Sequence, residues 1–84
     1  MRVEMELRNL PAPQIISYLL EAGGTQTGER QAAGDGWTAE LVSLPPAEYR
    51  VMSIPRDRLV LEGETEAVER LYAFMRRKTL RGGG

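Results

Sequence analysis

The side chains of this sequence that could do chemistry are carboxylates and arginines. The chain has no cysteine and no histidine, so it lacks the thiolates and imidazoles used in zinc sites, nucleophilic catalysis and proton transfer at neutral pH. Two acidic groups, Glu4 with Glu6 and Glu62 with Glu64 and Glu66, have the residue type for general acid and base catalysis. Glu4 and Glu6 belong to a solvent-exposed strand face, where little should shift the pKa of a carboxyl group. The second group lies at the start of a predicted helix, where acidic residues complement the helix dipole. We therefore predict no catalytic residue, no metal site and no cofactor, and favour a protein without enzymatic activity.

A second set of candidate residues is basic and lies near the end of the sequence. It consists of Arg76, Arg77, Lys78 and Arg81. These residues could contact phosphates, together with Arg50, Arg56 and Arg58 from neighbouring strands. Sheets that bind single-stranded nucleic acid usually expose aromatic rings, whereas the first strand here exposes Arg and Glu. Because basic residues at a helix end also complement the helix dipole, we expect no nucleic-acid partner, and the net charge of -1 gives no global attraction to one.

Two aromatic residues, Trp37 and Tyr49, stand where strands are predicted to begin. Such rings could form a lip that stacks on a ligand. A tryptophan beside a hairpin can instead close the end of a hydrophobic core, which is the interpretation we favour. With the basic set, these two residues make up the predicted interaction surface.

The first part of the chain predicts a strand and a helix. Arg2 to Arg8 alternates apolar and charged residues with the period of a half-buried strand. Gln14 to Ala22 has apolar residues at helical spacing, and Gly23-Gly24 provides a helix stop. The polar stretch Thr25 to Ala33 is either a weak strand or a long loop.

The second part predicts three more strands and a longer helix. Gly34-Asp35-Gly36 has the signal of a tight hairpin, after which Trp37 to Leu44 forms a strand that ends at Pro45-Pro46. Tyr49 to Ile54 is a further strand, Pro55-Arg56-Asp57 a turn, and Arg58 to Glu62 a strand covered on both faces. Acidic residues from Glu64 and basic residues up to Lys78 frame an amphipathic helix.

These elements predict a single α+β domain over residues 1–80, followed by a flexible glycine tail at 81–84. The order β-α-β-β-β-β-α suits an antiparallel sheet of four to five strands with both helices packed on one face. The same order resembles one repeat of the TATA-binding-protein-like fold.

The end of the sequence, Leu80-Arg81-Gly82-Gly83-Gly84, resembles the diglycine end of ubiquitin-like modifiers and sulfur carriers. The resemblance implies a thin tail that an adenylating enzyme can thread into its active site. Those families have β-grasp folds that open with a strand hairpin, end on two glycines, and have a tail that leaves a strand. Here the chain opens with a strand and a helix, and the tail leaves a helix. We therefore favour a glycine helix stop followed by a frayed end.

The chain as a whole is similar to a small uncharacterised family from thermophilic bacteria, a domain of unknown function. The similarity is carried by LRNLPAPQIISYLLEAGG, by EGETEAVERLYAFMRRK, and by a composition in which Lys78 is the single lysine among 11 basic residues. Such a composition fits a heat-adapted or a GC-rich organism. The resemblance brings no functional residues with it.

The sequence therefore favours a small non-enzymatic interaction or assembly module. The alternative is a small-ligand-binding or catalytic domain that uses arginines and carboxylates. A core this small has neither disulfide nor metal to support it, so burial of a strand edge or sheet face against a second copy would add stability. We expect a homo-oligomer, with an unknown protein partner as a further option. Because the chain shows no signal peptide and no membrane-length apolar run, we expect a cytoplasmic location and no membrane partner.

Overall fold

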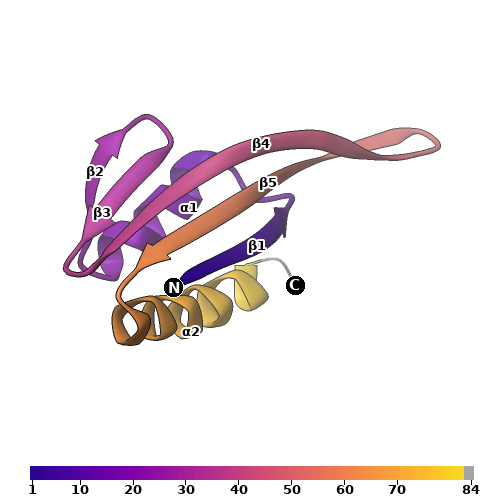
Figure 1. Ribbon diagram of the computed structural model, residues 1–84. Coiled ribbons are helices and arrows are strands. Elements are labelled where there is room, and N and C mark those ends of the chain that lie inside the picture. The colour runs from indigo at the N-terminus through magenta and orange to yellow at the C-terminus, as the bar shows by residue number, and fades with distance from the viewer. Residues whose placement is uncertain (83–84) are drawn as a thin grey trace.

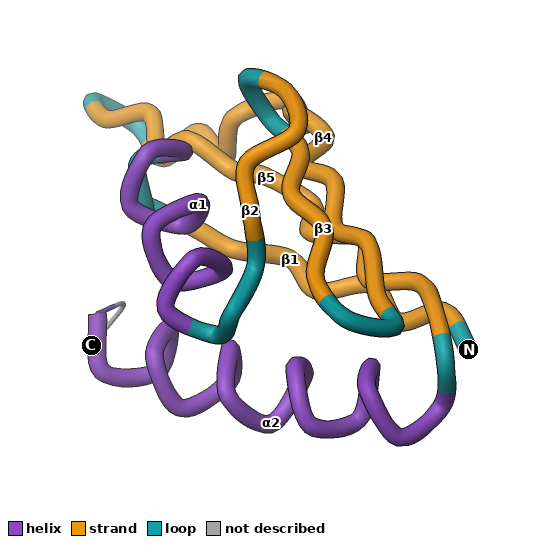
Figure 2. Tube along the Cα trace, turned by 90° about the vertical axis from the view of Figure 1, so that its left-hand side faces the viewer, coloured by secondary structure: helices purple, strands orange, loops and turns teal. Residues whose placement is uncertain are grey.

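The computed structural model describes the backbone of residues 1–82 and the side chains of residues 1–80. The elements follow the order β1 (Arg2–Arg8), α1 (Ala12–Glu21), β2 (Thr25–Gly28), β3 (Gln31–Gly34), β4 (Trp37–Tyr49), β5 (Met52–Gly63) and α2 (Thr65–Gly82). The strands form one antiparallel sheet in the spatial order β1-β5-β4-β3-β2, and both helices pack on the same face (Figure 1, Figure 2). The predicted fold class, element order and packing are confirmed.

The start of the chain follows the predicted pattern closely. β1 has the expected bounds, with its charged residues exposed and Leu7 buried. α1 begins after Pro11, whose missing N–H costs nothing in a first helical turn. The helix ends where the N–H groups of Gly23 and Gly24 donate to the carbonyls of Leu20 and Leu19, each at 3.0 Å. Because Gly23 has a φ of 100°, which only glycine adopts freely, the predicted glycine stop is correct.

The hydrophobic core lies between the sheet and the two helices. Its largest fully buried side chains come from α1, β5 and α2. They are Ile15, Leu19, Leu59, Leu61, Val68 and Met75. Val60, between two of the core residues, is also buried on the opposite face of the sheet, but Arg58 and Glu62 are exposed on that face. The prediction that Arg58 to Glu62 is covered on both faces is therefore wrong outside Val60, because both helices pack on one face.

The stretch from Thr25 to Ala33 is a hairpin at the edge of the sheet. β2 and β3 pair with each other, and β3 pairs in turn with β4 from Gln31 to Gly34. The strand alternative is therefore correct, with a turn at Glu29 and Arg30 dividing it in two. The Asp-Gly hairpin between β3 and β4 is also confirmed, and Gly36 takes a φ of 84° there.

Residues 45–57 differ from the predicted pattern. β4 does not end at Pro45-Pro46 but continues to Tyr49, and the predicted strand Tyr49 to Ile54 is a tight turn followed by the start of β5. The predicted turn at residues 55–57 lies inside β5. The prolines fit because a bulge interrupts the register between Leu44 and Ala47, and because neither strand has another neighbour there.

The outer part of this hairpin, residues 45–55, projects from the body as an arm (Figure 1). β3 pairs with β4 only as far as Glu40, and β1 pairs with β5 only as far as Arg56, so the strands of the arm pair only with each other. At the base of the arm, the N–H of Asn9 donates to the carbonyl of Pro55 at 2.9 Å. The arm accounts for the elongated shape, whose extents are 42 × 23 × 21 Å.

α2 runs along the sheet and includes the first part of the predicted glycine tail. It begins at Thr65 and continues through Gly82. Gly83 and Gly84, the rest of that predicted tail, lie outside the described residues. Within residues 1–82, neither helix has the length and apolar character needed to cross a membrane.

Candidate functional site

The predicted basic set at the end of α2 does not form one surface. Arg76, Arg77 and Lys78 are consecutive, so their side chains leave the helix about 100° apart. The Nζ of Lys78 lies 2.8 Å from Oε1 of Glu21 on α1 and helps to hold the two helices together. Arg76 and Arg77 remain exposed, and the side chain of Arg81 lies outside the described part of the chain. The described residues of the set therefore do not present a continuous row of cations to a phosphate backbone.

The arginines predicted to join this set lie elsewhere. Arg56 and Arg58 project from the sheet face opposite the helices, where they pair with Glu6 at 3.0 Å and with Glu4 at 3.5 Å. Arg50 is at the turn of the arm, with a φ of 34°. The structure thus places the two groups of basic residues on different elements, one on α2 and the other on β5 and the turn before it.

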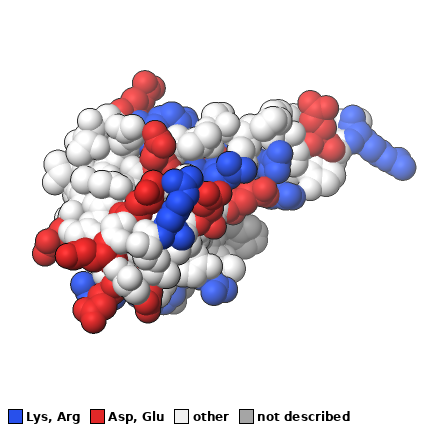
Figure 3. Space-filling model, viewed as in Figure 1, with Lys and Arg blue, Asp and Glu red and all other residues white. Residues whose placement is uncertain are grey.

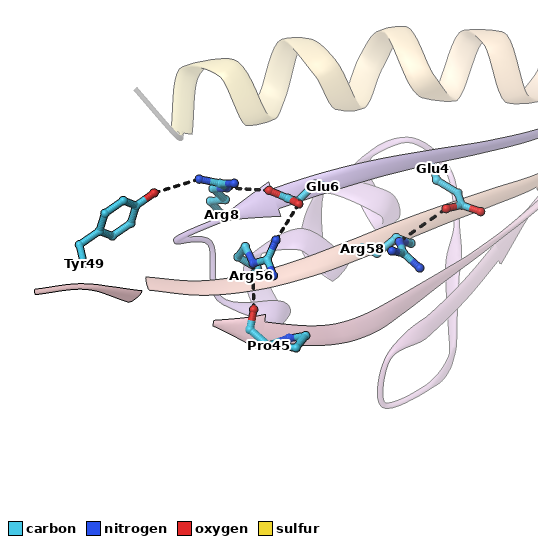
Figure 4. A network of polar contacts seen from close by, with 7 residues as sticks. All are labelled: Glu4, Glu6, Arg8, Pro45, Tyr49, Arg56 and Arg58. Carbon is cyan, nitrogen blue, oxygen red and sulfur yellow. Dashed lines mark hydrogen bonds and ion pairs between the residues drawn. The ribbon is translucent and has the colours of Figure 1, made fainter. Parts of the chain in front are cut away.

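The open face of the sheet carries an ordered row of alternating charges (Figure 3, Figure 4). Arg8 donates to Glu6 at 2.6 Å and to the hydroxyl of Tyr49 at 3.1 Å, while Arg56 donates to Glu6 at 3.0 Å. The hydrogen bond from Arg8 and the positive charges of Arg8 and Arg56 lower the pKa of Glu6 below its usual value. The expectation that little would shift this pKa is therefore wrong. Because the shift is downward, Glu6 stays ionised at neutral pH and is unsuited to act as a general acid.

Trp37 and Tyr49 do not form a ligand lip, because they stand at opposite ends of β4. Trp37 is 7% exposed and belongs to the core. Its indole ring lies directly over Gly24 and Gly34, where a Cβ atom would collide with it. The interpretation of Trp37 as a core-closing residue is correct, and Tyr49 is 49% exposed on the arm.

A groove on the described surface lies between α2, the end of α1 and the β3–β4 turn. It has a volume of about 540 Å³, an apolar floor that includes Trp37, Leu71 and Phe74, and a rim that includes Arg70 and Arg77. Neither of these arginines makes an ion pair within the described part of the chain. We call this feature the α2 groove. Our sequence analysis missed it, although the spacing of Arg70, Phe74 and Arg77 places them on one helix face.

One buried ion pair was also missed. Asp57 is 8% exposed on the core side of β5, where its carboxylate pairs with the guanidinium of Arg30. Arg30 also donates from Nε to the carbonyl of Leu41 at 3.1 Å. The pair ties the β2–β3 turn to the middle of the sheet and does not open onto a groove that contains both charges. We therefore assign it a structural role.

The described residues contain no group of three or more acidic side chains that could hold a metal ion. In a comparison with protein families, residues 3–84 match a family described as "Archaeal MoaD-like protein". No curated protein matches the chain. The match corrects the resemblance to a bacterial family of unknown function and gives no support to a TATA-binding-protein-like relationship; the expectation of a small-domain family is correct. Since the match spans nearly all of the sequence, the chain belongs to the archaeal MoaD-like family.

Proposed function

We propose that this protein is a carrier or modifier without catalytic activity of its own, in which the glycine run Gly82–Gly84 bears the reacting carboxylate. The observation that carries the proposal is the match to the archaeal MoaD-like family, which extends through the glycine run to residue 84. The match strengthens the resemblance between this run and the diglycine end of sulfur carriers. It favours a functional role for the glycines over a simple helix stop.

In a chain whose last residue is Gly84, the chemistry would take place at the carboxyl group of that glycine, in the active site of a separate adenylating enzyme. The carboxylate attacks the α-phosphorus of ATP, and pyrophosphate leaves to give an acyl adenylate. Hydrosulfide or an amine then attacks the acyl carbon, and AMP leaves to give a thiocarboxylate or an amide. The carrier supplies only the carboxylate and a narrow segment without side chains, so the folded part of the carrier needs no catalytic residue.

The described part of the chain is consistent with a carrier that provides the carboxylate while a separate enzyme provides the catalytic residues. α2 is anchored to the core by the buried side chains of Val68, Leu71 and Met75, and it leads directly into the glycine run. The open sheet face carries charges that are paired with one another. Because the run follows a helix here and a strand in β-grasp carriers, the adenylating enzyme would have to approach the end of α2.

The proposal is tested by incubating the chain ending in Gly84 with ATP, a sulfide donor and an adenylating enzyme that activates members of this family. Intact-mass spectrometry should show the acyl adenylate, or the replacement of one carboxyl oxygen by sulfur. A variant lacking Gly83 and Gly84 is the matched control and should keep its mass. An unchanged mass for the full chain, with an enzyme that modifies its usual carrier in parallel, would overturn the proposal.

A second candidate function, binding of a small ligand, rests on the α2 groove. Its volume falls in the range of small-molecule sites, and its floor is apolar. The unpaired Arg70 and Arg77 favour a ligand with an anionic group and an apolar body, while Asp35 at the far wall would select against a second negative charge nearby.

A thermal-shift screen against nucleotides and carboxylate metabolites tests this second candidate. A ligand of this groove should raise the melting temperature of the natural chain, and Arg70→Gln together with Arg77→Gln should abolish the shift. Arg76→Gln is the control, because Arg76 is on the same helix but does not line the groove. A shift that survives the double substitution would place the ligand elsewhere.

A further inference from the structure

The glycine run follows α2 with no linker between them. α2 continues through Gly82, and in a chain whose last residue is Gly84 the last two residues extend at most about 7 Å beyond it. An enzyme that holds the carboxylate of Gly84 in its active site must therefore come within about that distance of the helix end. Its surface has to meet the last turns of α2, which lies at the edge of the molecule (Figure 2).

Two side chains of these last turns are open to solvent. Leu80 is 68% exposed, and Arg77, one turn earlier, is also exposed. At a rise of about 1.5 Å per residue, Leu80 lies about 3 Å and Arg77 about 7.5 Å before Gly82 along the helix axis. Residues three positions apart are neighbours on a helix surface. A surface that reaches the glycine run therefore has both side chains within reach.

A groove at the helix end joins these two side chains to Phe74. It has a volume of about 420 Å³ and is lined by Phe74, Arg77, Lys78 and Leu80. Phe74 and Arg77 also line the α2 groove, so the two grooves meet at these residues. We call Phe74, Arg77 and Leu80 the α2 end face. Its two apolar side chains flank a cation.

Arg77 is available to a partner, whereas its neighbour Lys78 is not. Glu69 is the last acidic residue of the sequence, so no acidic side chain follows it on α2. Lys78 is held by Glu21 of α1 at 2.8 Å. Arg77 pairs with no carboxylate among the residues whose side chains the structure describes. Because a guanidinium binds a carboxylate through two parallel hydrogen bonds, Arg77 suits an acidic partner.

We propose that the adenylating enzyme docks on the α2 end face. An acidic side chain of the enzyme binds Arg77, and an apolar side chain enters the groove between Phe74 and Leu80. The acidic contact belongs at the helix end, because Asp35 lines the α2 groove but not the end groove and would repel a carboxylate there. This inference rests on the proposed carrier function and adds the surface by which the enzyme recognises the carrier.

Isothermal titration calorimetry tests the proposal, with the full chain and an adenylating enzyme that activates members of this family, in the absence of ATP. Arg77→Glu should raise the Kd by at least about tenfold, because it replaces an attraction by a repulsion. Arg77→Lys keeps the charge and should recover most of the affinity. Added salt should weaken the binding of the natural chain more than that of Arg77→Glu.

Arg50→Glu is the matched control for net charge. It changes the charge of the chain by the same amount, but Arg50 is exposed at the turn of the arm, which projects away from α2 (Figure 1). Charges separated by more than about 8 Å are largely screened at physiological salt, so this variant should bind as the natural chain does.

Leu80→Ser tests the apolar part of the contact. Leu80 lines the groove at the helix end but not the α2 groove, so this substitution leaves the candidate small-ligand site intact. It should raise the Kd by about threefold or more, because less apolar surface leaves water on binding. Circular dichroism checks that every variant is folded.

The outcomes separate this inference from the carrier function. If the enzyme modifies the full chain but binds Arg77→Glu and Leu80→Ser as tightly as the natural chain, the α2 end face is not the docking surface and the carrier function stands. If the natural chain is neither bound nor modified, both proposals are wrong. Binding that falls with Arg77→Glu and Leu80→Ser, and not with Arg50→Glu, is the result that the proposal predicts.

Discussion

At Asp57, the protein places a carboxylate on the core side of its sheet and balances it with a single cation. Asp57 is 8% exposed, and the Arg30 guanidinium is its partner. Replacement of Arg30 by methionine keeps much of the side chain's length but leaves the buried carboxylate without that charge. We predict that Arg30→Met lowers the free energy of unfolding by about 1–3 kcal/mol, measured by urea denaturation.

Arg58→Met is the control for this prediction. Arg58 pairs with Glu4 on the open face, where both side chains are more than two-fifths exposed. An exposed pair contributes little, so the control should change the free energy of unfolding by less than about 1 kcal/mol. Equal losses in the two variants would show that burial does not distinguish these pairs.

The pKa of Glu6 provides a second prediction for a single residue. The hydrogen bond from Arg8 and the nearby positive charges favour the ionised carboxylate in the folded protein, so its pKa is lowered there relative to the unfolded chain. The stabilising contribution of Glu6 is therefore present above its unfolded pKa and is lost as the pH falls through its folded pKa. We expect Arg8→Gln to raise the folded pKa of Glu6, as followed by NMR of its side-chain carboxyl carbon. An identical titration in both proteins would show that Arg8 is not the cause.

At the scale of elements, the local sequence pattern was sufficient to predict a helix or strand wherever its apolar residues recur with the period of that element. β1 alternates with period two, and the two helices have apolar stripes with glycine or charge signals at their ends, so their positions could be predicted from residues alone. The hairpin from Pro45 to Asp57 could not be predicted in this way. Its prolines normally end a central strand, but they are tolerated here because a bulge and two free edges remove the need for their N–H groups.

The candidate sites show the same limit. The role of Trp37 in the core follows from its place beside a hairpin. The α2 groove depends on where α1 and the β3–β4 turn come to lie against α2. The Arg30–Asp57 pair joins residues 27 positions apart. None of these features has a local pattern that specifies it fully, because each is created by tertiary contacts.

The isolated pairing of the arm leads to a prediction for this element. The strands within residues 45–55 pair only with each other, the hydrogen bonds from the body to this segment come from Arg8, Asn9 and Arg56, and the buried core side chains lie outside this range. Replacement of residues 45–55 by an Asn-Gly turn between Leu44 and Arg56 should therefore leave a folded domain with cooperative thermal unfolding. Loss of cooperative unfolding would show that the arm is needed for the fold itself.

At the scale of the whole molecule, the protein combines a small α+β body with a glycine run at the end of its longer helix. The body buries its apolar residues in one core, and the chain belongs to the archaeal MoaD-like family. In our account, the folded body offers surfaces for binding, and the carboxylate of the glycine run is the reacting group. This view explains why a chain without cysteine or histidine need not be inert.

The most direct test of this account is the exchange of radiolabelled pyrophosphate into ATP, catalysed by an adenylating enzyme that activates members of this family. The exchange reports the first step alone, attack of the glycine carboxylate on ATP and its reversal. We predict exchange that depends on the chain ending in Gly84 and falls to background when Gly83 and Gly84 are removed. Background exchange with the full chain, or equal exchange with both chains, under conditions where the enzyme's usual carrier is active, would contradict the account.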